Sequence, residues 1–193
     1  MLPLKDNLPT DRLPIVTIAL IAANVAAWFV LHDGGFLVLL VDVLFMWWFG
    51  PSVEDSMSRP RFALLCLLGG GVAFGLQALL DGDAVAPAAT VGAMGAVAAV
   101  LGGYAVLYAR ARVLSVVPLP LLAGLVELPA LVLLAVWFAL QALLAATSLG
   151  DVAGDGGAAF LAQLGGFGVG LLAIKLLVQR PKPIPAHARG ALS

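Results

Sequence analysis

The sequence predicts an all-α membrane protein built from six transmembrane helices. Hydrophobic residues make up 62% of its 193 positions and charged residues only 11%, whereas a soluble domain carries about 25% charged residues. The mean hydropathy is +1.08. The apolar residues are collected in long stretches separated by short polar turns, and about 20 such residues are needed for a helix to cross a bilayer.

The first half of the chain contains three of these stretches. Residues 1–14 are polar and carry three prolines, which predicts a surface leader on the cytoplasmic side. The spans follow at 15–31, 36–50 and 62–80, and a polar loop at 51–61 separates the last two. Because further spans follow, we expect the first helix to be retained and not removed as a signal peptide.

Glycine spacing predicts how the helices pack. A central helix is expected to begin after Pro87 and to end near residue 108. In it, Gly95, Ala99 and Gly103 recur every four residues, so they share a face on which another backbone can come close. We therefore place this helix in the middle of the bundle.

Two further glycine pairs have the same spacing. They are Gly71 with Gly75 in the third span, and Gly166 with Gly170 in the sixth. Both pairs are expected to form packing faces.

The apolar stretch at 113–146 is too long for one straight span. Three prolines and a glutamate in its first part predict an irregular segment at 113–126, lying at or dipping into the cytoplasmic interface, followed by a fifth helix at 130–146. The sixth span is expected at 158–178. The membrane domain thus covers residues 15–178, and the proline-rich tail at 179–193 is expected to be disordered.

The distribution of charge supports six spans. With this number, every basic residue lies on one side of the membrane and the loops on the other side hold only acids. The ten basic residues are Lys5, Arg12, Arg59, Arg61, Arg110, Arg112, Lys175, Arg180, Lys182 and Arg189. The positive-inside rule then places both termini in the cytoplasm.

Composition also limits the function. The net charge of −1 and the high hydropathy argue against a nucleic-acid partner. Cys66 is the single cysteine, so no intramolecular disulfide can form, and we expect it to be a small core residue. The sequence has no metal-ligand cluster, phosphate-binding loop or nucleotide motif, and we predict no cofactor.

Asp42 is the only acid well inside a predicted span. An ionisable residue at such depth costs about 2.5–3.5 kcal/mol on insertion scales and usually faces the interior of the bundle. It is protonated, hydrogen-bonded to an amide or hydroxyl, or open to a water-filled cavity. The structural interpretation is a carboxyl group bonded to a neighbouring helix, and the functional one is a proton relay or substrate contact.

Met94 and Gln163 are expected to lie in the same outer zone of the membrane as Asp42, which makes the three residues a candidate substrate cavity. Met94 is also explained as a gap-filling core residue, and Gln163 as an interhelical hydrogen bonder, because an amide does not act as a general base.

The remaining polar residues are weaker candidates. Asn24, Gln77 and Gln141 are expected to join helices by hydrogen bonds. Glu127 is expected to pair with Arg110 or Arg112 at the interface. The two histidines, His32 and His187, lie outside the spans, so a serine in the membrane has no general base.

Several short segments, spread over nearly the whole chain, together form a family pattern. They are Leu2-Pro3-Leu4-Lys5-Asp6-Asn7 with Pro14-Ile15-Val16-Thr17, Phe49-Gly50 with Val53-Glu54-Asp55, Arg59 with Arg61-Phe62, Val126-Glu127-Leu128-Pro129 with Trp137-Phe138, and Gly165-Gly166-Phe167 with Gly170. In these segments the chain resembles the rhomboid family of intramembrane serine proteases in its compact six-helix form. The resemblance implies a rhomboid-like bundle.

The active-site positions that the resemblance assigns hold other residues. Met94 stands where the family has the serine nucleophile of a Gly-x-Ser-Gly motif, and Gln163 stands where it has the histidine base. Val38 and Asp42 occupy the positions of a histidine and an asparagine that help to hold the oxyanion. An anion at Asp42 would repel a developing oxyanion instead of stabilising it.

The resemblance and these replacements together predict a pseudoprotease that binds transmembrane segments of other proteins without cleaving them. Its partners would be the lipid bilayer and those helices, and its location a bacterial cytoplasmic membrane. Two alternatives stay open. Family membership alone implies an intramembrane serine-type endopeptidase, and the buried Asp42 is compatible with a small conduit for protons or polar solutes.

Overall fold

The structure, a computed structural model, describes residues 12–31, 36–81, 88–109, 111–116, 125–148 and 155–179. These residues form six helices and one β-hairpin. The elements are α1 (Ile15–Leu31), α2 (Phe36–Asp55), α3 (Arg59–Asp81), α4 (Ala88–Leu107), β1 (Arg112–Val116), β2 (Leu125–Pro129), α5 (Ala130–Ser148) and α6 (Asp155–Leu177).

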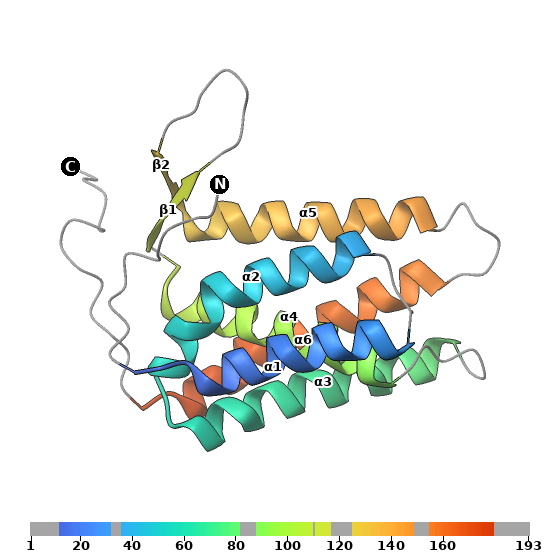
Figure 1. Cartoon of the computed structure of the whole chain (residues 1–193), viewed down its shortest axis with the longest axis horizontal. Coiled ribbons are helices and arrows are strands. Elements are labelled where there is room, and N and C mark those ends of the chain that lie inside the picture. Colours follow the sequence, from blue (N-terminus) through green and yellow to red (C-terminus); the bar gives the residue numbers. More distant parts are fainter. Residues whose placement is uncertain are drawn as a thin grey trace.

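The six helices run roughly side by side, with the hairpin at one end of the bundle (Figure 1). Helix α4 contacts each of the other five helices. Its residues from Gly95 to Tyr104 are all buried. The expectation that the glycine-rich helix lies inside the bundle is therefore confirmed.

Small residues allow α4 and α6 to approach closely. A Cβ atom added to Gly166 would lie 2.6 Å from the carbonyl oxygen of Gly95, and one added to Gly170 would overlap the carbonyl oxygen of Ala99. On the same side of α4, Gly103 faces the side chain of Ile174. The packing role expected for Gly166 and Gly170 is thus confirmed, because any larger residue would push these two backbones apart.

The packing face expected for Gly71 and Gly75 is wrong. A Cβ atom added to either residue meets no atom within 4 Å. Helix α3 instead turns Gly69 and Gly70 towards α4, where a Cβ on Gly70 would lie 2.6 Å from the carbonyl oxygen of Gly92. The four-residue spacing of Gly71 and Gly75 predicts a face of α3 that does not meet α4. The contact with α4 is made by Gly69 and Gly70, one to two residues before Gly71.

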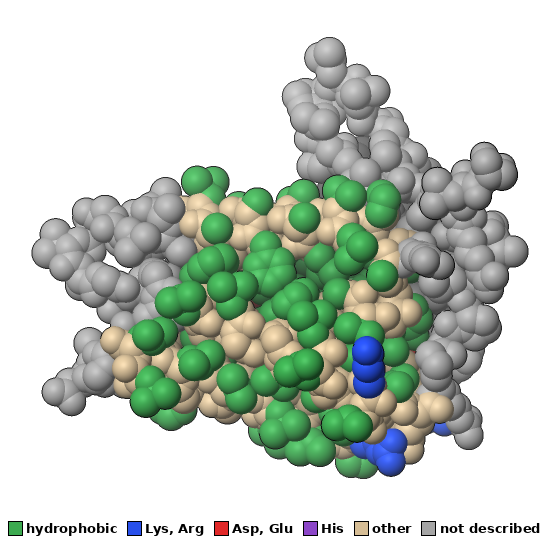
Figure 2. Space-filling view, turned by 180° about the vertical axis from the view of Figure 1, so that it is seen from behind, with side chains coloured by type: hydrophobic (Ala, Val, Ile, Leu, Met, Phe, Trp, Pro, Cys, Tyr) green, Lys and Arg blue, Asp and Glu red, His purple; other side chains and the backbone are tan. Residues whose placement is uncertain are grey.

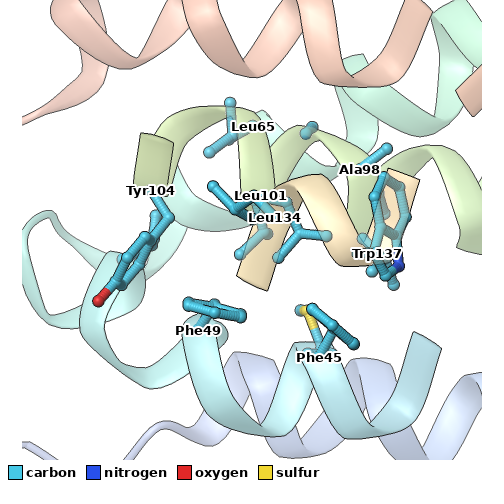
Figure 3. Packing of buried hydrophobic residues seen from close by; sticks show 14 of the residues in the cluster. Phe45, Phe49, Leu65, Ala98, Leu101, Tyr104, Leu134 and Trp137 are labelled. Atoms are coloured by element: carbon cyan, nitrogen blue, oxygen red, sulfur yellow. The ribbon is translucent and has the colours of Figure 1, made fainter. Parts of the chain in front are cut away.

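Large side chains fill the space between α2, α4 and α5. Figure 3 shows Phe45 and Phe49 of α2 directed towards α4 and α5. The ring of Phe49 meets that of Tyr104 edge-on, with centroids 4.6 Å apart, and the Phe45 ring lies 6.3 Å from that of Trp137. Tyr104, Phe49 and Trp137 are fully buried, so this cluster joins three helices in one core.

Helix α2 is five residues longer than predicted, because it continues through Pro51 to Asp55. A proline inside a helix removes a hydrogen bond and costs about 3 kcal/mol. Here the added turn buries Val53 completely and brings Glu54 to three hydrogen-bond donors at the start of α1. These contacts offset the cost, and the polar loop expected at 51–61 shrinks to the turn between α2 and α3.

The segment expected to be irregular contains two strands. Arg112–Val116 pairs antiparallel with Leu125–Pro129, and Arg112 lies opposite Pro129. Both segments are rich in valine and leucine, and valine favours strands. Pairing also satisfies backbone groups that a non-helical apolar segment would otherwise leave without partners.

Apolar side chains cover much of the outer surface. Figure 2 shows a face that is largely hydrophobic, with lysine and arginine side chains at one end. Two helical segments among the described residues, Arg59–Leu80 and Phe160–Leu177, are long and apolar enough to cross a membrane. Shorter apolar helices occur at Ile15–Val30, Val91–Leu107 and Ala130–Leu143. Leu172 and Leu176 are about four-fifths exposed, which suits contact with lipid better than contact with water.

The described basic side chains lie at one end of the bundle. Arg12 precedes α1, Arg59 and Arg61 lie in the first turn of α3, and Lys175 lies in the last turn of α6. The guanidinium of Arg61 donates to the carbonyl oxygen of Leu177 at 3.4 Å, which ties the start of α3 to the end of α6. This clustering agrees with the one-sided charge expected from the sequence.

Candidate functional site

Asp42 lies on the face of α2 that is turned towards α5. Its side chain is 4% exposed. The Nε2 amide of Gln141 on α5 donates to its Oδ1 atom at 2.9 Å. A carboxyl group without water needs such a partner, because an unpaired buried charge is costly. Asp42 is therefore bonded to a neighbouring helix, and the expectation that Gln141 joins helices is confirmed.

Trp137 lies one turn before Gln141 on the same side of α5. Its indole N–H is directed towards Asp42, yet it makes no well-formed hydrogen bond with any described residue. Trp137 also packs against Phe45, one turn after Asp42 on α2. The contact between α2 and α5 thus combines one polar pair with an aromatic contact beside it.

Met94 lies in the second turn of α4 and is half-buried. The next residue, Gly95, faces α3, where an added Cβ would lie 2.7 Å from the carbonyl oxygen of Gly69. A thioether is a soft packing group. It has no proton to lose and cannot form an acyl intermediate as a serine or cysteine does.

Gln163 is buried in α6 and is 4% exposed. Its neighbour Ala162 packs with Ala73 of α3 and Val91 of α4 in a small apolar cluster. The described residues include neither of the chain's two histidines, His32 and His187. Position 163 of α6 itself carries an amide and not an imidazole.

No hydrogen bond joins Asp42 to Gln163, both of which the structure describes. Asp42 is bonded instead to Gln141 of α5. The large groove lined by described residues lies elsewhere, between α1, α3 and α4, and includes neither Asp42 nor Met94 nor Gln163. The side chains of Val38 and Glu127 lie outside the described residues, as does the tail from residue 180 onwards.

The other expected polar residues have simple surroundings. Gln77 is 1% exposed, and its Oε1 atom has no hydrogen-bond partner among the described residues. Cys66 is buried in the hydrophobic core, as expected. No group of three metal-ligating side chains occurs in the part of the chain that the structure describes.

Sequence reasoning missed the role of Glu54. Its side chain is 5% exposed. Its Oε1 atom accepts from the backbone N–H of Val16 at 3.0 Å, and its Oε2 atom accepts from the N–H and the hydroxyl of Thr17 at 2.8 and 2.7 Å. The first N–H groups of a helix have no partner within the helix, so Glu54 caps α1 from the end of α2.

Comparison with known proteins gives one match. The model of the Rhomboid domain family matches residues 16–180. Neither the curated proteins nor the solved structures include a match to the chain.

Proposed function

The chain belongs to the rhomboid family and is an integral membrane protein, and we propose that it acts as a pseudoprotease that binds transmembrane segments of other proteins. The observation that carries this proposal is the chemistry of the positions assigned to the active site. A thioether at Met94 and an amide at Gln163 supply neither nucleophile nor base.

The surroundings of Asp42 support the same proposal. An oxyanion hole needs donors aimed at the developing negative charge. Asp42 offers carboxylate oxygens, and one of them already accepts the amide of Gln141. In its ionised form Asp42 has no donor to aim at an oxyanion, so the family scaffold would not help another nucleophile at this position.

The proposal also includes the topology. Six spans with both termini on the cytoplasmic side place all ten basic residues on that side. The clustering of Arg12, Arg59, Arg61 and Lys175 at one end of the bundle supports this orientation. In a bacterial cell the location would be the cytoplasmic membrane.

The binding proposal is tested by reconstituting the purified protein in liposomes with a synthetic single-span helix carrying a fluorophore at each end. We expect saturable energy transfer from a donor on the protein and an intact peptide after prolonged incubation. An unrelated six-helix protein at the same density is the control. Association no greater than in the control would overturn the binding proposal.

The same sample separates this proposal from the endopeptidase alternative, which family membership favours. A serine-directed fluorophosphonate should label no residue of the folded protein. Labelling at a single residue, together with cleavage of the helical peptide, would establish a peptidase and refute the pseudoprotease assignment.

The conduit alternative rests on the burial of Asp42. It predicts a proton flux into liposomes that Asp42→Asn abolishes. Because Gln141 already occupies one oxygen of Asp42, we expect no flux above that of empty liposomes.

A further inference from the structure

A groove of about 580 Å³ lies between α1 and α3, and α4 forms its floor. It is lined by small residues on all three helices, such as Ala23 of α1, Gly71 of α3 and Ala93 of α4. Gly71 and Leu67 on its rim are exposed, Leu67 by 73%. The groove is therefore open along the outer surface of the bundle.

The lining is almost entirely hydrocarbon. Apart from the amide of Asn24 and the thiol of Cys66, the lining residues have no polar side-chain atom. Water in such a groove would find few hydrogen-bond partners, and buried waters need two to four of them. In a membrane protein the groove must be filled by an apolar occupant from the bilayer.

The length of the groove matches one leaflet. Its lining on α1 extends from Val16 to Ala27, and its lining on α3 from Ala63 to Phe74. Eleven residues of helix span roughly 16 Å, and half of the hydrocarbon core is about 15 Å. The groove begins in the first turn of α1 and the second turn of α3, which is the end where the basic residues lie.

We propose that this groove binds an acyl chain of a phospholipid from the leaflet at the basic end of the bundle. Its volume falls within the range of about 300–1,000 Å³ found for small-ligand sites. A transmembrane helix of about 20 residues runs about 30 Å, roughly twice the length of the groove. The groove therefore suits a lipid chain better than a transmembrane helix, and the proposal is independent of the one made for the protein's function.

The charges at the open end predict little headgroup selection. Among the described residues next to the start of α1, Arg12 and Arg59 lie beside Glu54 and Asp55, so these two basic groups are balanced by two acids. A zwitterionic and an anionic phospholipid should bind alike, because the acyl chain supplies the contact area.

The test uses a matched pair of glycine substitutions in α3. Gly71 lines the groove and Gly75, one turn further along, does not. A Cβ atom at either position meets no atom within 4 Å, so both substitutions should leave the fold intact. Gly71→Leu places a side chain in the groove, and Gly75→Leu places the same side chain outside it.

Native mass spectrometry of the full chain in mild detergent, titrated with dioleoyl phosphatidylethanolamine or phosphatidylglycerol, measures the bound lipid. Wild type and Gly75→Leu should each retain one lipid, and Gly71→Leu should bind about tenfold more weakly, as for two methylenes displaced from the groove. Equal retention by the three proteins, or no retained lipid in wild type, would overturn the proposal. A dimer that both substitutions dissociate would also overturn it, because a second copy would then occupy this face.

A direct measurement covers the outcome in which Gly71→Leu fails to fold. A phosphatidylcholine with a diazirine in its acyl chain, photolysed in liposomes with the wild-type protein, should label α1 and α3 at groove residues such as Ala23 and Ala27. Leu172 of α6, which is 78% exposed, reports labelling by bulk lipid. Labelling of the groove no stronger than that of Leu172 would contradict the proposal.

Discussion

The hydrogen bond between Gln141 and Asp42 joins α5 to α2 beside the aromatic contact of Trp137 with Phe45. Interhelical hydrogen bonds in membranes contribute about 0.6 kcal/mol on average and about 1–2 kcal/mol in model peptides. Removing Gln141 costs more than the energy of the bond itself, because the buried carboxyl group then keeps only the indole N–H of Trp137 near it, and that group forms no well-formed hydrogen bond. Asp42 and Gln141 are both 4% exposed, so water does not replace the lost partner.

Gln141→Leu should therefore lower the free energy of unfolding by about 1–2 kcal/mol. Gln77→Leu is the matched control, because Gln77 is equally buried but its Oε1 atom lacks a partner among the described residues. We expect its effect to be below about 0.5 kcal/mol or stabilising. Reversible unfolding in mixed detergent micelles measures both. Equal destabilisation by the two variants would show that the bond to Asp42 contributes nothing specific.

Sequence reasoning identified Asp42 for a physical reason and missed Glu54 for another. A lone acid in an apolar stretch is conspicuous, because it must find a partner. The identity of that partner depends on the register between α2 and α5, which periodicity does not give. Glu54 lies in a segment that the sequence predicts to be a polar loop, where an acid is unremarkable. Its bonds to Val16 and Thr17 depend on how α2 packs against α1, which only the structure shows.

Helix α1 is fastened to the bundle at its first turn by Glu54. Glu54→Ala removes the acceptor for two backbone N–H groups and one hydroxyl, and should cost about 1–3 kcal/mol. Thr17→Val removes only the hydroxyl donor and should cost about 1 kcal/mol. Limited proteolysis before α1 and thermal unfolding in detergent report the two effects. A larger loss for Thr17→Val than for Glu54→Ala would contradict the capping role.

The contact between α4 and α6 depends on the absence of side-chain volume. Gly170→Ala would place a methyl group against the carbonyl oxygen of Ala99 and should destabilise the protein by about 1–3 kcal/mol, as overpacking does. Gly168→Ala lies in the same helix and meets no atom within 4 Å. It should be neutral or stabilising by up to about 1 kcal/mol. Unfolding in detergent measures the stability of both variants. An equal loss of stability in Gly170→Ala and Gly168→Ala would mean that the effect does not come from the contact with Ala99.

The helices themselves were predicted well, and their contacts less well. The bounds of α1, α4 and α5 agree with the sequence expectation to within two residues, because apolar length and turn residues are local signals. The four-residue glycine spacing succeeded in α6 and failed at Gly71 and Gly75. Spacing shows which residues share a face, whereas the partner of that face is set by the rest of the bundle.

At the scale of the molecule, family and architecture follow from the whole pattern. The family model covers residues 16–180, and the described residues form six helices, five of which contact α4. The hairpin was not predicted, because it depends on the pairing of β1 with β2, and neither five-residue segment alone has a sequence pattern that indicates this pairing. The function does not follow from the architecture, because one fold can carry an intact site or an altered one.

The family's chemistry depends on several residues acting as a unit, so restoring two of them should restore little. Met94→Ser with Gln163→His returns a nucleophile and a base to the positions that the resemblance assigns to them. Val38 and Asp42 would still stand where the family holds the oxyanion, and a single missing donor in such a hole costs about 10²–10³ in kcat. We expect the double variant to cleave a fluorogenic helical substrate at no more than about 1% of the rate of the quadruple variant that adds Val38→His and Asp42→Asn.

Rates within a factor of about three of each other would mean that the second-helix positions matter little. Correct folding of both variants, checked by their unfolding transitions, is the condition for this comparison. If the quadruple variant folds and neither variant cleaves, the scaffold itself has lost the geometry for catalysis, and the pseudoprotease proposal gains its strongest support.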